Sequence, residues 1–336
     1  MAWGKPSADG NPAAELISKA RTTPSLHILP FRAFGDAECV ALFAALRGNR
    51  TLTELRASGH ALGVVSLQAL GALLASGDEC AIRHLAIGNA SLGGAGQSPT
   101  AALVAALRTA PALRKLCLGG NALRDEVAVA LGGAMGAVVG AVALGGAMGA
   151  VVGAVALGGV PQSVPLSEGA VGALPGMAPT TAPIVPIPAP KVPITASWSS
   201  LTELDARSNR LGVAGAAALV RLGAPLLTLS LFDNPAVGGE ARDGGRRLAD
   251  ALRVAAPSLH TLDIGACGLD EPAHLAALTE ALRDGGAPGL KCLEVFGNGA
   301  AEENGSEWRE ALTALREVRS GLDVAWKEPD TKAQPG

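Results

Sequence analysis

The stretch LTELRASGHAL, from Leu52 to Leu62, returns as LTELDARSNRL from Leu201 to Leu211. Both copies follow the frame L-x-x-L-x-L-x-x-N-x-L, with Ala accepted at the third Leu and His60 at the Asn position of the first copy. Three more stretches fit well: LRKLCLGGNAL, LLTLSLFDNPA and LKCLEVFGNGA. IRHLAIGNASL shifts the Asn by one place, and LHTLDIGACGL puts Cys267 there. A frame that recurs through the chain indicates a repeat architecture.

Each frame predicts a short strand followed by a helix. The second and third leucines are two residues apart, so their side chains point to one side of a strand and are expected to face the core. The Asn side chain can bond backbone groups where the chain bends after the strand. Ala- and Leu-rich runs with helical spacing follow, such as VSLQALGALLASG and HLAALTEALRDGG. Gly or Pro closes most of these runs, as is typical of helix ends.

The spacing of the frames identifies a resemblance. They begin at residues 52, 82, 113, 201, 226, 259 and 290, so the steps are 25–33 residues long except for one of 88. This pattern resembles the leucine-rich repeat family, specifically its long-repeat, ribonuclease-inhibitor-like class, over residues 24–326 apart from the long step. The resemblance implies an α/β leucine-rich-repeat solenoid, a horseshoe with a concave parallel sheet and outer helices. His60, Ala90 and Cys267, which replace the Asn, imply local irregularity within that fold.

The long step predicts an insert in the third clear repeat. It holds a 13-residue unit twice in succession, LGGAMGAVVGAVA from Leu131 and from Leu144, and then a Pro-rich part. Lengthening one connection has a modest entropic cost that a solenoid tolerates. Trp308 and Trp326 are expected to cover the end of the stack. The predicted segments are an N-terminal tail (1–23), the first part of the leucine-rich repeats (24–136), a low-complexity Gly/Ala/Val then Pro-rich insert (137–197), the second part with a C-terminal cap (198–326) and a tail (327–336).

A membrane-associated segment is the alternative for this insert. Residues 127–160 are uncharged and long enough to span a bilayer. They contain G-x-x-x-G at Gly136 and Gly140 and again at Gly149 and Gly153, a spacing found in packed membrane helices. However, Gly is unfavourable within a helix, and a single crossing would place the two groups of repeats on opposite sides. We therefore favour a loop over a membrane element.

Composition limits the compartment and the class of partner. The formal net charge of -3 gives no sign of nucleic-acid binding. Five cysteines without a C-x-x-C pair indicate neither a disulfide framework nor a zinc site, and suit a reducing compartment. The N-terminus shows no apolar secretory segment. We expect a cytoplasmic monomer that uses no cofactor, binds a protein partner and binds no nucleic acid.

The candidate binding surface is the concave face, where the x positions of each strand are expected to be exposed. The first three repeats place basic side chains there, and the later repeats place acidic ones, so a partner of opposite polarity would be steered and held in register. Aromatic and Arg side chains are common among residues that dominate binding energy. The predicted partner-binding residues are Arg56, Arg83, His84, Arg114, Lys115, Glu203, Asp205, Arg207, Phe232, Asp263, Glu294 and Phe296.

Catalytic and metal-binding motifs are not found. None of the five histidines stands in H-E-x-x-H or in a close ligand pair. Cys117 and Cys292 are expected on the open sheet face, but no His lies at a spacing that nominates either as a nucleophile. The main hypothesis is a non-enzymatic protein-interaction scaffold. One alternative is a regulator of a small GTPase or another enzyme, because GTPase activators occur in the long-repeat family; another is a membrane-associated repeat protein.

Overall fold

The part of the chain that carries the predicted frames forms one unit of the protein. The computed structural model describes residues 12–28, 35–60, 62–76, 79–88, 92, 97–108, 110–132, 198, 200–222, 224–239, 243–299 and 305–326. All of them belong to a single unit. The predicted insert at 137–197 and the C-terminal tail at 327–336 lie outside the described residues, as does Ala90.

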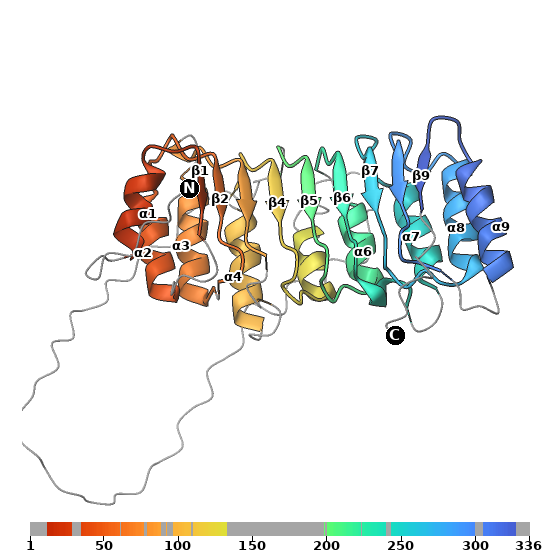
Figure 1. The fold of residues 1–336 in the computed structure, drawn as a ribbon, viewed down its shortest axis with the longest axis horizontal. Helices are drawn as coiled ribbons and strands as arrows, with labels where there is room; N and C mark the ends of the chain where they lie inside the picture. The colour runs from red at the N-terminus through yellow and green to blue at the C-terminus, as the bar shows by residue number, and fades with distance from the viewer. Residues whose placement is uncertain are drawn as a thin grey trace, which may run out of the picture. The chain divides into compact units, whose positions relative to one another are not determined.

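One parallel sheet runs the length of this unit. Its nine strands pair in chain order, each with the next, and the sheet is open at both ends. Figure 1 shows the strands side by side in one layer and the helices in a second layer. The strands are β1 (Ser25–His27), β2 (Glu54–Arg56), β3 (His84–Ala86), β4 (Lys115–Cys117), β5 (Glu203–Asp205), β6 (Thr228–Ser230), β7 (Thr261–Asp263), β8 (Cys292–Glu294) and β9 (Asp323–Ala325).

Helices connect most successive strands. In order, the helices are α1 (Pro12–Ala20), α2 (Asp36–Ala45), α3 (Val64–Leu74), α4 (Gln97–Arg108), α6 (Val213–Val220), the short η3 (Pro235–Val237), α7 (Gly244–Arg253), α8 (Pro272–Arg283) and α9 (Gly305–Arg316). Residues 125–132 are also helical. The order of strands and helices is the one that the repeated frame predicts.

The strand residues alternate between core and surface as the frame requires. The middle residue of every strand is buried, and in most strands the two residues beside it are half-buried or exposed. In β2, for example, Leu55 is fully buried, as is Ala57 just after the strand. The predicted inward direction of the second and third leucine positions is therefore confirmed.

Buried asparagines tie the bends after β4, β5, β6 and β8 to neighbouring repeats. Asn121, Asn209, Asn234 and Asn298 are all buried. The amide nitrogen of Asn209 donates to the carbonyls of Leu118 and Ala206 at 3.1 and 2.9 Å, and its carbonyl oxygen accepts from the backbone N–H groups of Asn121 and Leu123, both at 3.0 Å. Each side chain of this kind satisfies backbone groups that would otherwise be buried without partners.

Two of the predicted replacements fill the Asn position in similar ways. The His60 ring is buried and lies with Nε2 3.2 Å from the carbonyl oxygen of Ile28. The Cys267 thiol donates to the carbonyl of Leu231 at 3.2 Å. His60 and Cys267 therefore occupy the Asn position as buried side chains that contact a backbone carbonyl of the preceding repeat.

Small residues set the spacing of the helix layer. A Cβ atom on Gly71 of α3 would lie 3.0 Å from Cα of Ala106 in α4. A Cβ atom on Gly245 of α7 would lie 2.3 Å from Cα of His274 in α8. Because carbon atoms do not approach so closely without displacement, glycine at these positions lets successive helices pack backbone to backbone.

The N-terminal tail is shorter than predicted. Helix α1 lies within residues 1–23 and places Leu16 and Ala20 in the core. These two residues are four apart and so share one face of the helix. That spacing is visible in the sequence PAAELISKA, although the segment carries no copy of the frame.

The repeats on either side of the predicted insert are direct neighbours. Strand β4 pairs in parallel with β5, with Leu116 opposite Leu204, although 85 residues lie between the strands. The pairing places both groups of repeats in one continuous sheet. Within the described ranges, no helix has the length and apolar character needed to span a bilayer.

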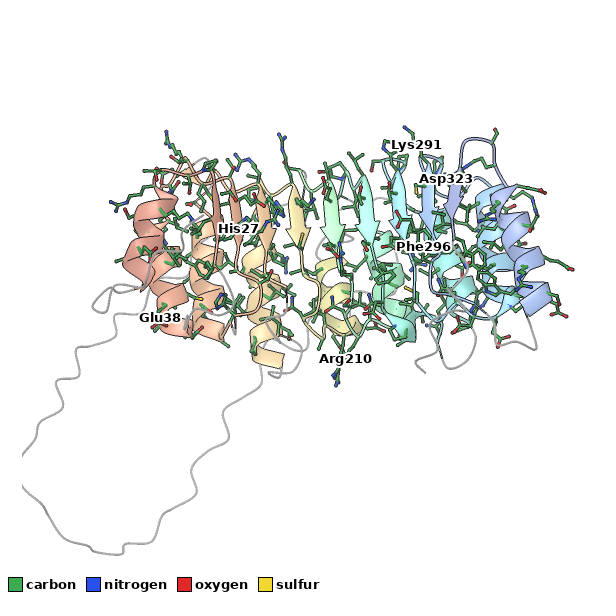
Figure 2. The ribbon with its side chains drawn as sticks, in the orientation of Figure 1. His27, Glu38, Arg210, Lys291, Phe296 and Asp323 are labelled. Carbon is green, nitrogen blue, oxygen red and sulfur yellow. The ribbon has the colours of Figure 1, made fainter. Side chains whose placement is uncertain are left out.

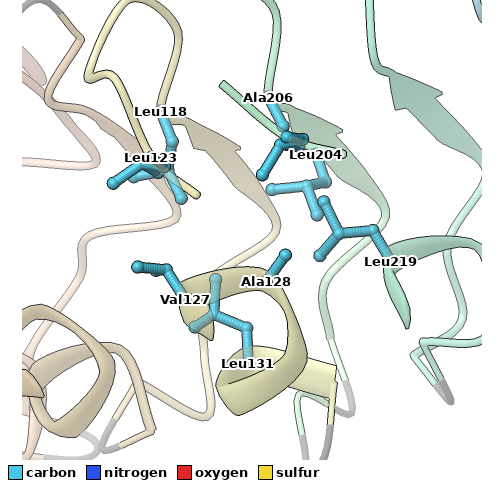
Figure 3. Close-up of a pocket in the computed structure, with 9 residues that line it drawn as sticks. Leu118, Leu123, Val127, Ala128, Leu131, Leu204, Ala206 and Leu219 are labelled. Atoms are coloured by element: carbon cyan, nitrogen blue, oxygen red, sulfur yellow. The ribbon is translucent and has the colours of Figure 1, made fainter. Parts of the chain in front are cut away.

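A small apolar cavity lies at this junction (Figure 3). It has a volume of about 10 Å³, and its lining includes Val127, Leu131 and Leu219. A buried water needs roughly 10–15 Å³ and two to four polar partners, which this lining does not supply. The cavity is thus a local packing gap where the two groups of repeats meet, and we do not treat it as a ligand site.

Candidate functional site

The candidate surface is the open face of the sheet, meaning the outward side chains of the strands and of the residue just beyond each strand. Parallel register aligns these side chains into rows across the repeats. The first row is Glu54, His84, Lys115, Glu203, Thr228, Thr261, Cys292 and Asp323. The second row is Arg56, Ala86, Cys117, Asp205, Ser230, Asp263, Glu294 and Ala325.

Glu54 neutralises much of the predicted basic end. Its carboxylate accepts a hydrogen bond from the guanidinium of Arg56, and one of its oxygens lies 3.0 Å from Nδ1 of His84. Burial alone would raise the pKa of Glu54, but hydrogen bonds from Arg56 and Ser25 and the charges of Arg56 and His84 lower it below its usual range. Sequence analysis did not include Glu54 in the site. The shared register of β2 and β3 is the signal that brings it beside His84.

Two further ion pairs join predicted site residues to one another. Lys115 lies 2.6 Å from a carboxylate oxygen of Glu203 on the next strand, and this contact raises the pKa of Lys115. The guanidinium of Arg207 donates to both carboxylate oxygens of Asp205 at 2.8 Å. The central part of the open face therefore carries charges that are largely paired within the protein.

Arg83 and Arg114 lie at the start of their strands. The guanidinium of Arg83 donates to the backbone carbonyls of Cys80 and Ile82, at 2.8 and 3.2 Å, and so is held against its own strand. Arg114 is exposed just before β4. The guanidinium of Arg83 is therefore already engaged by its own backbone, whereas Arg114 stands on the surface.

The C-terminal end of the open face is acidic. Asp263 and Glu294 are paired in register on β7 and β8, and Asp323 lies on β9. Burial and the charge of Asp263 raise the pKa of Glu294. The pKa of the nearby Cys292 thiol is also raised, first by burial and then by the charges of Glu294, Asp323 and Asp263. Burial is the main cause of both shifts, and the neighbouring carboxylates add to it.

Two phenylalanines lie beside these carboxylates. Phe232 follows β6, Phe296 follows β8, and Gly265 occupies the same place after β7. A Cβ atom on Gly265 would lie 2.8 Å from Cδ2 of Phe232 and 2.7 Å from the carbonyl oxygen of Phe296, so the Phe232 ring rests against the glycine backbone. The Phe232 side chain remains 38% exposed. We call Asp263, Glu294, Phe232 and Phe296 together the acidic–aromatic patch.

Other side chains surround the patch. Leu227, just before β6, is exposed to the same extent as Phe232. Sequence analysis did not single it out, although it precedes the strand in the position of Thr53 and Arg114. Figure 2 shows Lys291 and Asp323 near the start of the strands and Phe296 toward their other end. A partner lying along the strands would thus meet Leu227 and Lys291 before it reached the phenylalanines.

The structure brings a His beside Cys117, although no His lies at a spacing along the chain that nominates Cys117 as a nucleophile. Nε2 of His84 lies 3.8 Å from Sγ of Cys117. The two residues are far apart in the chain, but the register of β3 and β4 sets His84 opposite Lys115 and therefore diagonal to Cys117. The side chain directly opposite Cys117 is the small Ala86, which leaves room for the imidazole. Cross-strand distance, not spacing along the chain, decides this contact.

The described residues hold no cluster of three or more His, Cys, Asp or Glu side chains arranged to bind a metal ion. All five cysteines are free thiols. Cys39 and Cys267 are fully buried, and burial, the main cause, raises the pKa of each thiol to about 12.

Replacement of Glu294 by glutamine is expected to stabilise the protein slightly at pH 7. A carboxyl group whose pKa is raised by folding destabilises the folded state when it is ionised. This penalty disappears as the pH falls below 4.5, the ordinary pKa of a glutamate in the unfolded chain. Because the group is partly exposed, we expect a gain of less than about 0.5 kcal/mol at pH 7 and none at pH 4. Urea unfolding at both pH values measures the difference.

Glu310→Gln on the exposed side of α9 is the control for this substitution. A gain at pH 4 equal to that at pH 7 would contradict an electrostatic origin.

Comparison with solved structures supports the architecture. The leucine-rich repeat-containing protein LegL7 from Legionella pneumophila matches with 14% sequence identity and a TM-score of 0.50, over 94% of this chain and 79% of that one. A structure of the Rad7 and Elc1 complex in yeast matches at 14% identity and a TM-score of 0.36, over 87% of this chain and 65% of that one. Protein-family models and curated protein sequences give no match. The likeness to LegL7 bears on the fold, which is a leucine-rich-repeat solenoid.

Proposed function

We propose that this leucine-rich-repeat solenoid is a non-enzymatic scaffold that binds a protein partner through the acidic–aromatic patch. The observation that carries the proposal is the juxtaposition of Asp263 and Glu294 with Phe232 and Phe296 on an uncovered sheet face. A stack of repeats presents a broad surface suited to protein ligands. Repeat steps of 25–33 residues support the long-repeat, ribonuclease-inhibitor-like class, and five free thiols support a cytoplasmic protein.

The chemistry of the patch defines the partner. The exposed Phe232 and the half-buried Phe296 beside carboxylates favour a segment that carries Lys or Arg together with an apolar side chain. A cation placed between Asp263 and Glu294 would relieve their mutual repulsion, which adds to burial in raising the pKa of Glu294. The basic end contributes less than its sequence suggests, because Glu54 and Glu203 already pair with its cations.

We also propose that residues 137–197 form an insert that leaves the repeat stack intact, and that the protein is a monomer. The direct pairing of β4 with β5 supports the first part, since the sheet continues as if the intervening residues were absent.

Selection of peptides tests the binding proposal. We expect the intact protein to enrich basic peptides with apolar side chains from a random library of displayed peptides. Phe296→Ala is expected to raise the Kd of a selected peptide by about 10- to 30-fold, because truncation of a central aromatic anchor costs about 1.4–2 kcal/mol of binding free energy. Titration of the labelled synthetic peptide by fluorescence anisotropy gives the Kd.

A matched pair of charge variants separates local from overall charge. Asp263→Lys/Glu294→Lys is expected to abolish detectable binding. Glu310→Lys/Glu317→Lys changes the net charge equally, but on exposed positions of α9 and just after it, and is expected to leave the Kd within about twofold. Enrichment of acidic peptides, or equal loss in both double variants, would overturn the proposal.

A further inference from the structure

Three side chains on consecutive strands form a chain of contacts on the open face, away from the acidic–aromatic patch. Cys117 on β4 lies 3.8 Å from Nε2 of His84 on β3, and Nδ1 of the same ring lies 3.0 Å from Oε1 of Glu54 on β2. A thiol, an imidazole and a carboxylate in this order are the arrangement in which a nucleophile is paired with a base and the base with an orienting group.

The carboxylate selects the tautomer of the imidazole. An ionised carboxylate only accepts hydrogen bonds, so Nδ1 of His84 must carry the proton that it donates to Glu54. The lone pair of a neutral ring is then on Nε2, which faces the thiol of Cys117. Burial lowers the pKa of His84, while the charge of Glu54 opposes this shift. The ring is accordingly neutral at pH 7 and able to accept a proton.

Glu54 is itself held in place. Ser25 Oγ donates to Oε2 at 2.9 Å, and the guanidinium of Arg56 donates to Oε1. The Glu54 and His84 side chains are about one-fifth exposed, at 22% and 19%. A fixed carboxylate holds the imidazole beside Cys117, which is half-buried.

The surrounding charges affect both the base and the thiol. His84 lies near Glu54 and Arg56 on β2, Lys115 on β4 and Glu203 on β5. The pKa of Cys117 lies above its usual range, because burial and, after it, the charge of Asp205 raise it. The positive charges of Lys115, Arg207 and Arg56 offset only part of this rise. The resting pair is therefore a thiol and a neutral imidazole, which requires proton transfer at the moment of attack.

We propose that Cys117 is a base-assisted nucleophile that forms covalent adducts with soft electrophiles of the α,β-unsaturated carbonyl class, with His84 as the base and Glu54 as the positioning residue. In the first step Sγ bonds to the β-carbon, the S–H bond breaks and its proton passes to Nε2. The π electrons of the C=C bond move to give an enolate. The imidazolium then returns the proton to the α-carbon, so that no leaving group, oxidant or reductant is needed.

The protein contains an internal control for this site. Cys292 is also half-buried on the open face, but none of its neighbours among the described residues is an imidazole in hydrogen-bond reach. Cys39, Cys80 and Cys267 are buried in the core. A difference in rate between Cys117 and Cys292 therefore reports the base and not general exposure.

N-ethylmaleimide, an unsaturated imide, is the probe. The intact protein is treated with substoichiometric reagent at pH 7, and adducts are quantified by mass spectrometry on tryptic peptides 116–124 and 292–309, which contain Cys117 and Cys292. Because a positioned base typically contributes 100-fold or more, we expect Cys117 to react about 10- to 100-fold faster than Cys292. Equal rates would overturn the proposal.

Two variants and a pH profile identify the mechanism. His84→Asn is expected to reduce the rate at Cys117 about 10- to 100-fold without changing the rate at Cys292. In the unaltered protein, the rate of adduct formation at Cys117 should first rise with pH around the pKa of His84, which lies below the usual histidine range. The rate should then reach a plateau and rise a second time at higher pH as the thiolate forms. Glu54→Gln should move the rise at lower pH to a different pH and should reduce the rate on the plateau. An unchanged rate at Cys117 in His84→Asn, or a profile without the lower rise, would refute the role of the imidazole, provided that circular dichroism shows the variant to be folded.

Discussion

Replacement of Asn209 by alanine is expected to lower the free energy of unfolding by about 3–5 kcal/mol. The side chain is buried, and its amide satisfies two backbone N–H groups and at least two backbone carbonyls. Alanine leaves these groups without partners in a site that water does not reach. Each buried unsatisfied group costs about 1–3 kcal/mol, and local relaxation reduces the sum.

The position of Asn209 makes the loss cooperative. The groups that it satisfies belong to the repeat before the predicted insert and to the repeat after it. Stability in a stack depends on interfaces between neighbouring repeats, so damage at this junction uncouples β1–β4 from β5–β9. We therefore expect urea unfolding, followed by circular dichroism, to separate into two transitions as well as to move to lower urea.

Arg210→Ala is the control, because Arg210 is the exposed neighbour of Asn209 and projects from the loop in Figure 2. It should change the free energy of unfolding by less than about 0.5 kcal/mol. Asn209→Asp should be at least as destabilising at pH 7, since a buried carboxylate would place its negative charge against the carbonyls of Leu118 and Ala206. A midpoint for Asn209→Ala within error of that for Arg210→Ala would contradict the proposed role of the loop asparagine.

The frame predicts the strands and the asparagine loops because both follow from local chemistry. Leu55 and Ala57 are two residues apart and must share a face, and Asn209 bonds groups of its own bend and the adjacent one. The open face is different, since its chemistry depends on which residues the register sets side by side. Glu54 and His84 are 30 residues apart in the chain, and only the pairing of β2 with β3 shows that they meet.

The basic end of the open face carries less unpaired charge than its sequence suggests, for the same reason. Side chains taken one repeat at a time suggest a basic surface, whereas the paired strands place Glu203 beside Lys115. The acidic end keeps its charge because Asp263 and Glu294 are aligned with each other. Both the pairing of Lys115 with Glu203 and the alignment of Asp263 with Glu294 follow from the sequence if every strand is taken to pair with the next in the same register.

Trp308→Ala is expected to destabilise the last repeats by about 3–5 kcal/mol, the usual range for truncation of a large buried aromatic side chain. Trp308 projects from α9 and is 2% exposed, and its indole N–H donates to the carbonyl of Leu269 at 3.2 Å. Its ring packs at 5.5 Å, between centroids, against the half-buried Trp326 just after β9. The prediction that these two tryptophans cover the end of the stack agrees with their burial and contact.

The effect should be local because a terminal repeat has one neighbour only. Loss of Trp308 removes the contact that fastens α9 to the loop after β7, so α9 and β9 are expected to open before the central repeats. Hydrogen exchange measured by mass spectrometry should show faster exchange in residues 305–326 and unchanged protection in β5 and β6. Trp308→Phe retains most of the apolar volume and loses the hydrogen bond, so it should lose about 1–2 kcal/mol. Uniformly faster exchange across all strands in Trp308→Ala would mean that the last repeat is coupled to the whole stack. That result would contradict a local capping role for the Trp308 side chain.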